Sequence, residues 1–197
     1  MTRTTTNETV SGWERVATAI ERVRERLRRS TEALAAAGVP YAVIGGNAVA
    51  EWVGRIDDGA VRFTKDVDIL LRRTDLSRAI EAMRAGGFFH HQTFGVDMFL
   101  DGPDAKPSEA VHVIFAHEKV KESDLHLTPD VEDSEQGKFS VLSLEALVRM
   151  KLTSFRDKDR THVRDMIGVG LIDRSWIERV PRVLSHRLAE IFDSPES

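Results

Sequence analysis

The chain has 197 residues, of which 41% are hydrophobic and 30% are charged, and its formal net charge is −4. It is long enough to bury a hydrophobic core, and the negative charge argues against binding of nucleic acid by electrostatic attraction alone. Cysteine is absent, which excludes disulfides and thiolate metal sites and is compatible with a reducing cytoplasm. No stretch approaches the roughly 20 apolar residues of a membrane-spanning helix, so we expect a cytoplasmic globular protein with no membrane partner.

A long amphipathic helix is predicted near the start of the chain. Ser11 and Glu14 have the spacing of a capping box, and apolar residues then recur every three or four positions until Gly38. The arginines within residues 15–29 are typical of a solvated helix face. The apolar face is long enough to serve either the core or a homodimer.

A glycine turn follows a short apolar strand at residues 41–44. Gly45 and Gly46 form this turn, and we expect Asn47 to cap the next helix. Glycine has no Cβ, so the backbone can approach a phosphate closely, and the N-terminus of a helix favours an anion. The turn alone is a weak signal, because many strand-to-helix turns need glycine for steric reasons.

Two carboxylates stand one residue apart in the next predicted strand, which ends near Leu71. Successive side chains of a strand alternate between its faces, so Asp66 and Asp68 are expected on the same face. Neighbouring carboxylates repel each other unless a cation lies between them. Magnesium prefers oxygen ligands and retains waters and phosphates in its shell, so the sequence predicts a magnesium site here, with manganese as the alternative ion.

The remaining pattern predicts a mixed sheet followed by helices. The predicted elements are a helix at 75–85 and strands at 88–93, 96–100 and 111–115. The acidic segment 118–135 is interpreted as a solvated loop, and further helices are predicted to begin at Ser143, Asp159 and Pro181. We therefore expect an α/β (α+β) fold with a core over residues 1–140 and a helical portion over residues 141–197 packed on it.

Three segments together resemble a known enzyme superfamily. They read IGGNAVAEW, RFTKDVDIL and KLTSFRDKDRTHVRDMI. This combination resembles the DNA polymerase β-like nucleotidyltransferases, which share a GG or GS turn, a D-x-D strand and a third acid on a neighbouring strand. Over roughly residues 35–170 it looks most like the bacterial branch with AbiEii-type toxins and some antibiotic-modifying enzymes. The resemblance implies transfer of a nucleoside monophosphate from an NTP to a hydroxyl acceptor.

The resemblance also implies roles for particular residues. Asp66 and Asp68 would bind the magnesium ions and take part in catalysis, and backbone and cationic groups would hold the nucleotide. The residues expected to bind the nucleotide are Gly45, Gly46, Asn47, Arg62, Lys65, Lys151 and Lys158.

The third acid is where this chain departs from the superfamily pattern. The segment AVHVIFA offers His112 where an aspartate is expected. A neutral imidazole can bind a metal or accept a proton but supplies no negative charge. His112 is therefore one catalytic candidate, and Asp97 and Glu118 are alternatives for the missing acid. A different hypothesis is a catalytically degenerate protein that acts as a nucleotide- or partner-binding module.

A second group of charged residues occupies a predicted helix downstream. Lys158, His162 and Asp165 share one helical face, and Lys151 lies about two turns before Lys158. This face would either present cations to the nucleotide or hold only surface salt bridges. The sequence does not separate tRNA, a protein side chain or a small molecule as acceptor, and it leaves a homodimer and an antitoxin partner open.

Overall fold

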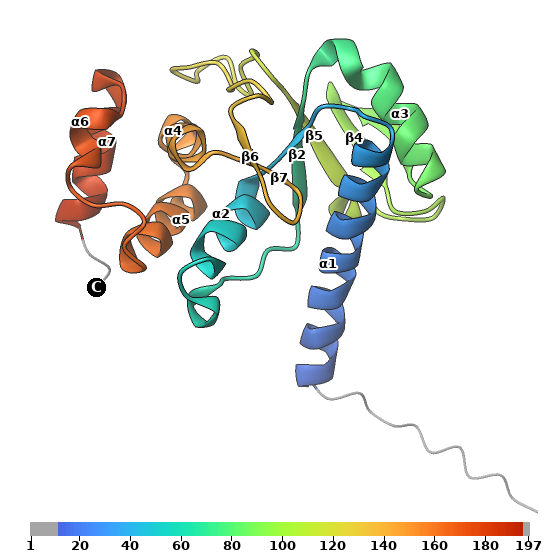
Figure 1. The fold of residues 1–197 in the computed structure, drawn as a ribbon, viewed down its shortest axis with the longest axis horizontal. Coiled ribbons are helices and arrows are strands. Elements are labelled where there is room, and N and C mark those ends of the chain that lie inside the picture. The colour runs from blue at the N-terminus through green and yellow to red at the C-terminus, as the bar shows by residue number, and fades with distance from the viewer. Residues whose placement is uncertain (1–11, 195–197) are drawn as a thin grey trace, which may run out of the picture.

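The computed structural model describes residues 12–194, in which a mixed seven-stranded sheet lies between two layers of helices (Figure 1). The strand order is β3-β4-β5-β2-β1-β7-β6. The strands are β1 (Ala42–Ile44), β2 (Val67–Leu71), β3 (Phe89–Thr93), β4 (Val96–Leu100), β5 (Val111–Phe115), β6 (Ser134–Gln136) and β7 (Ser140–Leu142). The α-helices are α1 (Gly12–Ala36), α2 (Gly45–Gly54), α3 (Leu76–Ala85), α4 (Leu144–Ser154), α5 (Asp157–Gly168), α6 (Trp176–Arg179) and α7 (Arg182–Asp193). The predicted α/β fold with a mixed sheet is confirmed.

The alternation of side chains along β2 separates a purely apolar face from a face that carries the candidate site. Val67, Ile69 and Leu71 pack into a cluster with α1 and α3. Leu70 belongs to a second cluster, which is shared with α2 and the helices from α4 to α7. Because alternate residues share a face, Asp68 points to the same side as Leu70. The aspartate therefore lies on the face that α2, α4 and α5 cover (Figure 1).

The start of α2 differs from the prediction. The helix begins at Gly45, directly after Ile44, and no side chain caps it. The prediction that Asn47 caps this helix is wrong, because Asn47 already lies within its first turn. Its amide instead donates a 2.7 Å hydrogen bond to the carbonyl oxygen of Asp66. Asn47 thus joins α2 to the segment that enters β2.

Two other predicted caps have different outcomes. Ser143 does cap α4, because its hydroxyl accepts a 3.4 Å hydrogen bond from the backbone N–H of Ala146. The predicted capping box at Ser11 lies outside the described residues.

A β-hairpin occupies a stretch that the sequence did not reveal as strand. It consists of β6 and β7, and β7 pairs in parallel with β1 through Val43 and Val141. Each of these strands has only three residues, which is too short for an alternating pattern to be recognised. The hairpin places Val141 and Leu142 in the core.

One buried apolar cluster joins the sheet to the C-terminal helices. It includes Ile44 of β1, Trp52 of α2, Leu142 of β7, Leu147 of α4 and Leu188 of α7. The indole N–H of Trp52 donates a 3.0 Å hydrogen bond to the carbonyl of Leu142. The helices after residue 141 therefore pack directly against the sheet face that carries Asp68.

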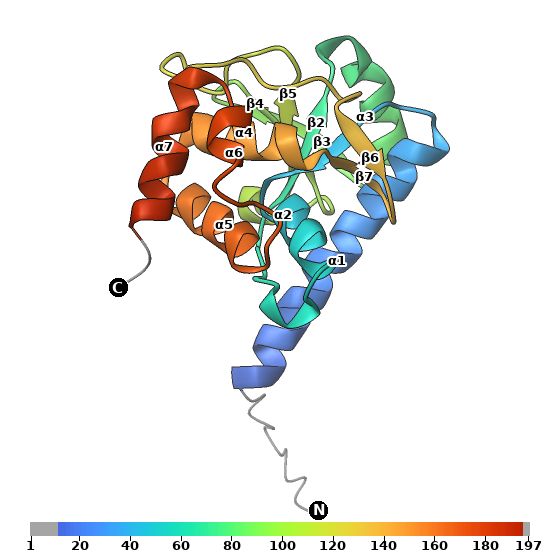
Figure 2. The same ribbon diagram turned by 60° about the vertical axis from the view of Figure 1, so that its left-hand side comes forward.

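The first half of α1 extends beyond the rest of the molecule (Figure 2). Leu27 and Leu34 are buried under the sheet, whereas Trp13 is 85% exposed and Val16 is 52% exposed. Only the second half of the helix thus contributes to the core. Among the helices within residues 12–194, none is both long and apolar enough to cross a membrane.

Candidate active site

The centre of the candidate site is a corner between Gly45 and Asp68. Antiparallel pairing of β1 with β2 sets Ile44 opposite Asp68, so the first residue of α2 lies beside the carboxylate. A Cβ atom at Gly45 would lie 2.2 Å from the Asp68 Oδ2 atom, and Gly45 has φ +69°. Both observations restrict this position to glycine. The corner places a carboxylate directly at the N-terminus of a ten-residue helix.

The carboxyl group of Asp68 is partly buried, with 24% of the side chain exposed. Burial has the largest effect and raises the pKa of its carboxyl group, and the charge of Asp66 raises it further. The charges of His112, Lys151 and Lys158 act in the opposite direction. Asp66 lies just before β2 rather than within it. The two aspartates are therefore close enough to repel each other, and a cation between them would relieve that repulsion.

His112 is brought beside Asp68 by the parallel pairing of β2 and β5. The two residues are direct partners in the register. The Nδ1 atom of His112 lies 3.7 Å from the Oδ1 atom of Asp68, and both side chains are about one-quarter exposed, at 25% and 24%. The structure thus places an imidazole next to the Asp68 carboxylate. Its catalytic role stays a prediction.

Asp97 is excluded as the missing acid by its position on the sheet. Met98 of β4 is paired with His112, so Asp97 points to the opposite face. It is 1% exposed and lies 2.8 Å from the Nε2 atom of His90. The suggestion that Asp97 fills the role is therefore wrong, because the sheet separates it from Asp68.

Glu118 is excluded as well, because it lies beyond the other end of β5. Its carboxylate accepts a 2.6 Å hydrogen bond from the Nε atom of Arg73, which follows β2. The strand alone carries the chain roughly 10 Å from His112 to Phe115, and Glu118 lies three residues further on. Neither alternative therefore supplies a third carboxylate at the corner.

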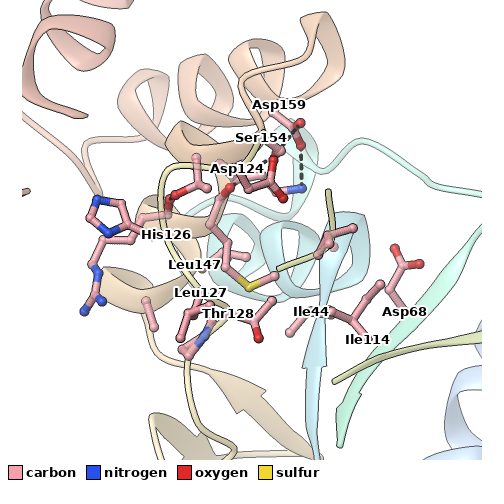
Figure 3. A pocket seen from close by; sticks show the side chains of 18 of the residues that line it. Ile44, Asp68, Ile114, Asp124, His126, Leu127, Thr128, Leu147, Ser154 and Asp159 are labelled. Carbon is pink, nitrogen blue, oxygen red and sulfur yellow. Dashed lines mark hydrogen bonds and ion pairs between the residues drawn. The ribbon is translucent and has the colours of Figure 1, made fainter. Parts of the chain in front are cut away.

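A buried network between α4 and α5 holds Lys151. Its Nζ atom lies 3.1 Å from the Asp159 Oδ1 atom, and the two side chains are 6% and 0% exposed (Figure 3). Burial lowers the pKa of Lys151 and also works against ionisation of Asp159. Hydrogen bonds from Arg156 and Ser154, together with the charge of Lys151, nevertheless keep the pKa of Asp159 well below its usual range. The network fixes Lys151 beneath the site, where its charge still acts on Asp68.

The face shared by Lys158, His162 and Asp165 is confirmed as part of α5, but its members differ in environment. Lys158 is exposed. Burial, followed by the charge of Lys151, lowers the pKa of His162 to about 4, so this side chain is neutral at pH 7. Asp165 accepts a 2.8 Å hydrogen bond from the Nε atom of Arg62. Arg62 therefore joins the segment before β2 to α5.

The other predicted nucleotide-binding residues are spread around the corner. Gly46 lies within the first turn of α2, where an added Cβ would come within 2.8 Å of the Thr64 Cβ atom. Lys65 is exposed, and Asn47 is bonded to the Asp66 carbonyl. The residues that the structure gathers around Asp68 are Gly45, Asp66, His112, Lys151 and Lys158.

A cavity of about 150 Å³ opens from this corner into the space between the sheet and α4. Asp68 and Gly45 line one end, and Asp124 and His126 line another part of its wall (Figure 3). The last two residues belong to the segment that the sequence indicated as a solvated loop, so sequence reasoning missed them. Local pattern gives no signal for this wall, because the apolar residues beside them, Leu125 and Leu127, are both exposed.

The corner suits a magnesium ion that shares its ligands with a substrate. Within residues 12–194, no group of three or more histidine or acidic side chains is arranged to enclose a metal. Magnesium typically binds one or two carboxylates and completes its shell with water and phosphate oxygens. The poorly solvated Asp68, the nearby charge of Asp66 and the close approach of the Gly45 backbone fit such an ion.

Comparison with solved structures relates this architecture to that of an antibiotic-resistance factor. The solution structure of the antibiotic-resistance factor ANT(2'')-Ia matches with a TM-score of 0.54 and 13% identity, over 90% of this chain and 95% of that chain. A crystal structure of ANT(2'')-Ia in complex with adenylyl-2''-tobramycin matches with a TM-score of 0.50 and 14% identity, over 90% and 99%.

Sequence comparison adds no closer relationship. No protein-family model and no curated protein sequence matches the chain. At 13–14% identity the structural likeness establishes the fold. The AbiEii-type branch stays a prediction. The geometry and the comparison together show that the chain has a nucleotidyltransferase-like fold.

Proposed function

We propose that this protein is a magnesium-dependent nucleotidyltransferase that moves a nucleoside monophosphate from an NTP to a hydroxyl acceptor. The observation that carries the proposal is the corner between Gly45 and Asp68. It combines a backbone that can approach a phosphate, the N-terminus of α2 and a carboxylate whose neighbour is a second aspartate. Anion binding at the helix and cation binding at the carboxylates are both needed for a metal–triphosphate complex.

The proposed reaction assigns a task to each group. The acceptor oxygen attacks the α-phosphorus, the bond between the α- and β-phosphates breaks, and pyrophosphate leaves with the electron pair. Magnesium, held by Asp66 and Asp68, would stabilise the charge that develops on the phosphate oxygens. His112, which lies 3.7 Å from Asp68, would accept the proton of the acceptor hydroxyl. Lys158 and the fixed charge of Lys151 would balance the triphosphate.

The acceptor is the least constrained part of the proposal. The enzyme ANT(2'')-Ia has been solved with adenylyl-2''-tobramycin, which favours a small molecule as one candidate. A tRNA end and a protein side chain are further candidates. A screen with total RNA, whole-cell protein and antibiotic panels in the presence of labelled NTPs would identify the class.

Binding of magnesium and NTP tests the proposal directly. Calorimetric titration of the purified protein is expected to show NTP binding that requires Mg²⁺, because the carboxylates hold the ion and the ion holds the phosphates. The double variant Asp66→Asn, Asp68→Asn should lose this binding. The variant Asp104→Asn, Asp157→Asn removes the same charge from two exposed positions and should retain it. Unchanged binding in the first variant would overturn the proposal.

A second function, a nucleotide-binding module without turnover, is favoured because neither Asp97 nor Glu118 supplies a third acid at the corner. Asp97 lies on the other face of the sheet and Glu118 lies beyond the far end of β5. The variant His112→Asp separates the two functions. A gain of nucleotidyl transfer would support the degenerate module, whereas loss of an existing activity would show that the histidine takes part in the reaction.

A further inference from the structure

The cavity beside Asp68 has walls suited to a flat apolar group. Ile44, Ile114, Leu127, Leu147 and Met150 line it, and they come from β1, β5, α4 and the segment after β5 (Figure 3). Its volume is about 150 Å³. An apolar cavity of roughly this size holds one benzene ring. The cavity therefore matches a single aromatic ring, whereas a fused double ring would have to project out of it.

His126, one of the residues that line the cavity, carries a polar atom without a hydrogen-bond partner. The Nε2 atom of His126 is buried and makes no hydrogen bond within the described residues. Leaving such an atom unsatisfied costs about 1–3 kcal/mol, so a buried polar atom of this kind needs an explanation. Asp124 lines the cavity too and is only 8% exposed. A ligand with hydrogen-bonding atoms on its edge would satisfy the imidazole.

The charges around the cavity point to a ligand with an anionic end. Lys151 and Lys158 lie where the cavity meets the corner, and their charges act on Asp68. Arg149 and Lys121 line the cavity as well. Cationic lining residues outnumber the acidic ones, because Lys121, Arg149, Lys151, Arg156 and Lys158 stand against Asp68, Asp124 and Asp159. They suit a molecule with phosphates at the corner and a neutral ring farther inside.

A separate groove is available for the acceptor. It has a volume of about 850 Å³ and lies between α1 and the segment before β2. Asn47 and Thr64 line it, and both contact Asp66 through its backbone. The groove thus lies next to the segment that carries Asp66, and apart from the smaller cavity.

We propose that the 150 Å³ cavity is the nucleobase subsite, that it selects pyrimidine nucleotides by size, and that His126 reads the edge of the base. This inference rests on the proposed function, because the triphosphate at the corner determines where the base lies. The ribose spans the distance from the corner to the cavity. Asp124 offers a carboxylate oxygen to an N–H group of the base, such as N4–H of cytosine or N3–H of uracil.

Titration with and without a base tests this inference. The probes are the α,β-methylene analogues of CTP, UTP, ATP and GTP, with the α,β-methylene analogue of ribose 5′-triphosphate as the base-free reference, all with Mg²⁺. We expect one or both pyrimidine analogues to bind at least about tenfold tighter than the reference and than either purine analogue. Loss of a buried hydrogen bond in His126→Ala should weaken pyrimidine binding by about tenfold and leave the reference unchanged.

A second variant fills the cavity without removing a polar group. Leu127→Trp should remove the advantage of the pyrimidine analogues, whereas Leu125→Trp, which adds the same ring two positions away at a residue that does not line the cavity, should not. Thermal melts of both variants check that the fold is retained.

The possible outcomes separate the two proposals. If neither the nucleotide analogues nor the base-free triphosphate bind with Mg²⁺, the proposed function fails and the subsite fails with it. If the base-free triphosphate binds but no nucleotide binds more tightly, only the subsite is overturned. Equal or tighter binding of purine analogues, or unchanged binding in both His126→Ala and Leu127→Trp, would also overturn it.

Discussion

At the scale of single residues, the site depends on a position where no side chain fits. Gly45 has φ +69°, and its backbone lies so close to Asp68 that a Cβ would come within 2.2 Å of the carboxylate. The contact involves the atom that is proposed to bind the metal. Any side chain here would displace the carboxylate from the N-terminus of α2.

The variant Gly45→Ala is expected to lose Mg²⁺-dependent NTP binding and to lower the free energy of unfolding by about 1–3 kcal/mol. Gly170→Ala is the matched control, because Gly170 has φ +79° but nothing within 4 Å of an added Cβ. Gly170→Ala should lower the free energy of unfolding by a similar amount and should leave NTP binding normal. Titration calorimetry and urea unfolding measure the two effects. Normal NTP binding in Gly45→Ala would contradict the role assigned to this corner.

At the scale of elements, the joint between α4 and α5 depends on a buried carboxylate. Asp159 is 1% exposed and accepts hydrogen bonds from Lys151, Ser154 and Arg156. The left-handed Phe155, with φ 48°, separates the two helices. The carboxylate therefore links the last turn of one helix to the first turn of the next and holds Lys151 under the site.

Replacing Asp159 by alanine leaves the buried ammonium of Lys151 without its partner. We expect the free energy of unfolding to fall by about 3–5 kcal/mol. Asp157→Ala removes a carboxylate from the same helix turn, where the side chain is fully exposed, and should change stability by about 0.5 kcal/mol or less. Urea unfolding monitored by circular dichroism compares the variants. Similar stability of the two variants would contradict a structural role for the network.

The same carboxylate predicts a pH dependence. The folded protein holds the pKa of Asp159 below its ordinary value of 3.8. The folded state therefore binds fewer protons than the unfolded chain as the pH falls below 3.8. The stabilisation that ionised Asp159 gives to the folded state is fully present above this pH and is lost progressively below it. The difference in stability between the wild type and Asp159→Ala should accordingly shrink in strong acid.

At the scale of the whole molecule, the sheet of the first 140 residues and the helices that follow it share one buried core. The hairpin of β6 and β7 extends the sheet at β1, and α4 and α7 cover the face that carries Leu70 and Asp68. One buried cluster contains residues from both sides of position 141. We therefore expect the sheet and the C-terminal helices to unfold together.

Calorimetry of the full chain should show a single transition with equal calorimetric and van't Hoff enthalpies. A fragment of residues 1–140 lacks most of β7 and the helices that cover one face of the sheet. It should have little near-ultraviolet circular dichroism and should bind no NTP. Two resolved transitions in the full chain, or a cooperatively folded fragment, would show that the parts are independent.

Much of the fold is readable from local patterns. The strands 96–100 and 111–115 were predicted with correct ends, because alternating or continuous apolar runs between turn residues define them. Ser143 was identified as a helix cap because a serine hydroxyl can accept a hydrogen bond from a backbone N–H of the first turn. The hairpin at 134–142 was not predicted, since its short strands are stabilised by pairing with β1, a partner about 100 residues away in the sequence.

The sequence by itself determined the residues of the corner. A glycine pair, two aspartates at strand spacing and a histidine on a later strand are local features, and their chemistry follows from residue type and spacing. Only the tertiary structure decided which of them meet. Strand register sets His112 beside Asp68 and turns Asp97 away, and helix packing brings the loop residue His126 to the same cavity. Register and packing depend on the whole core, because they follow from the burial of many distant side chains at once.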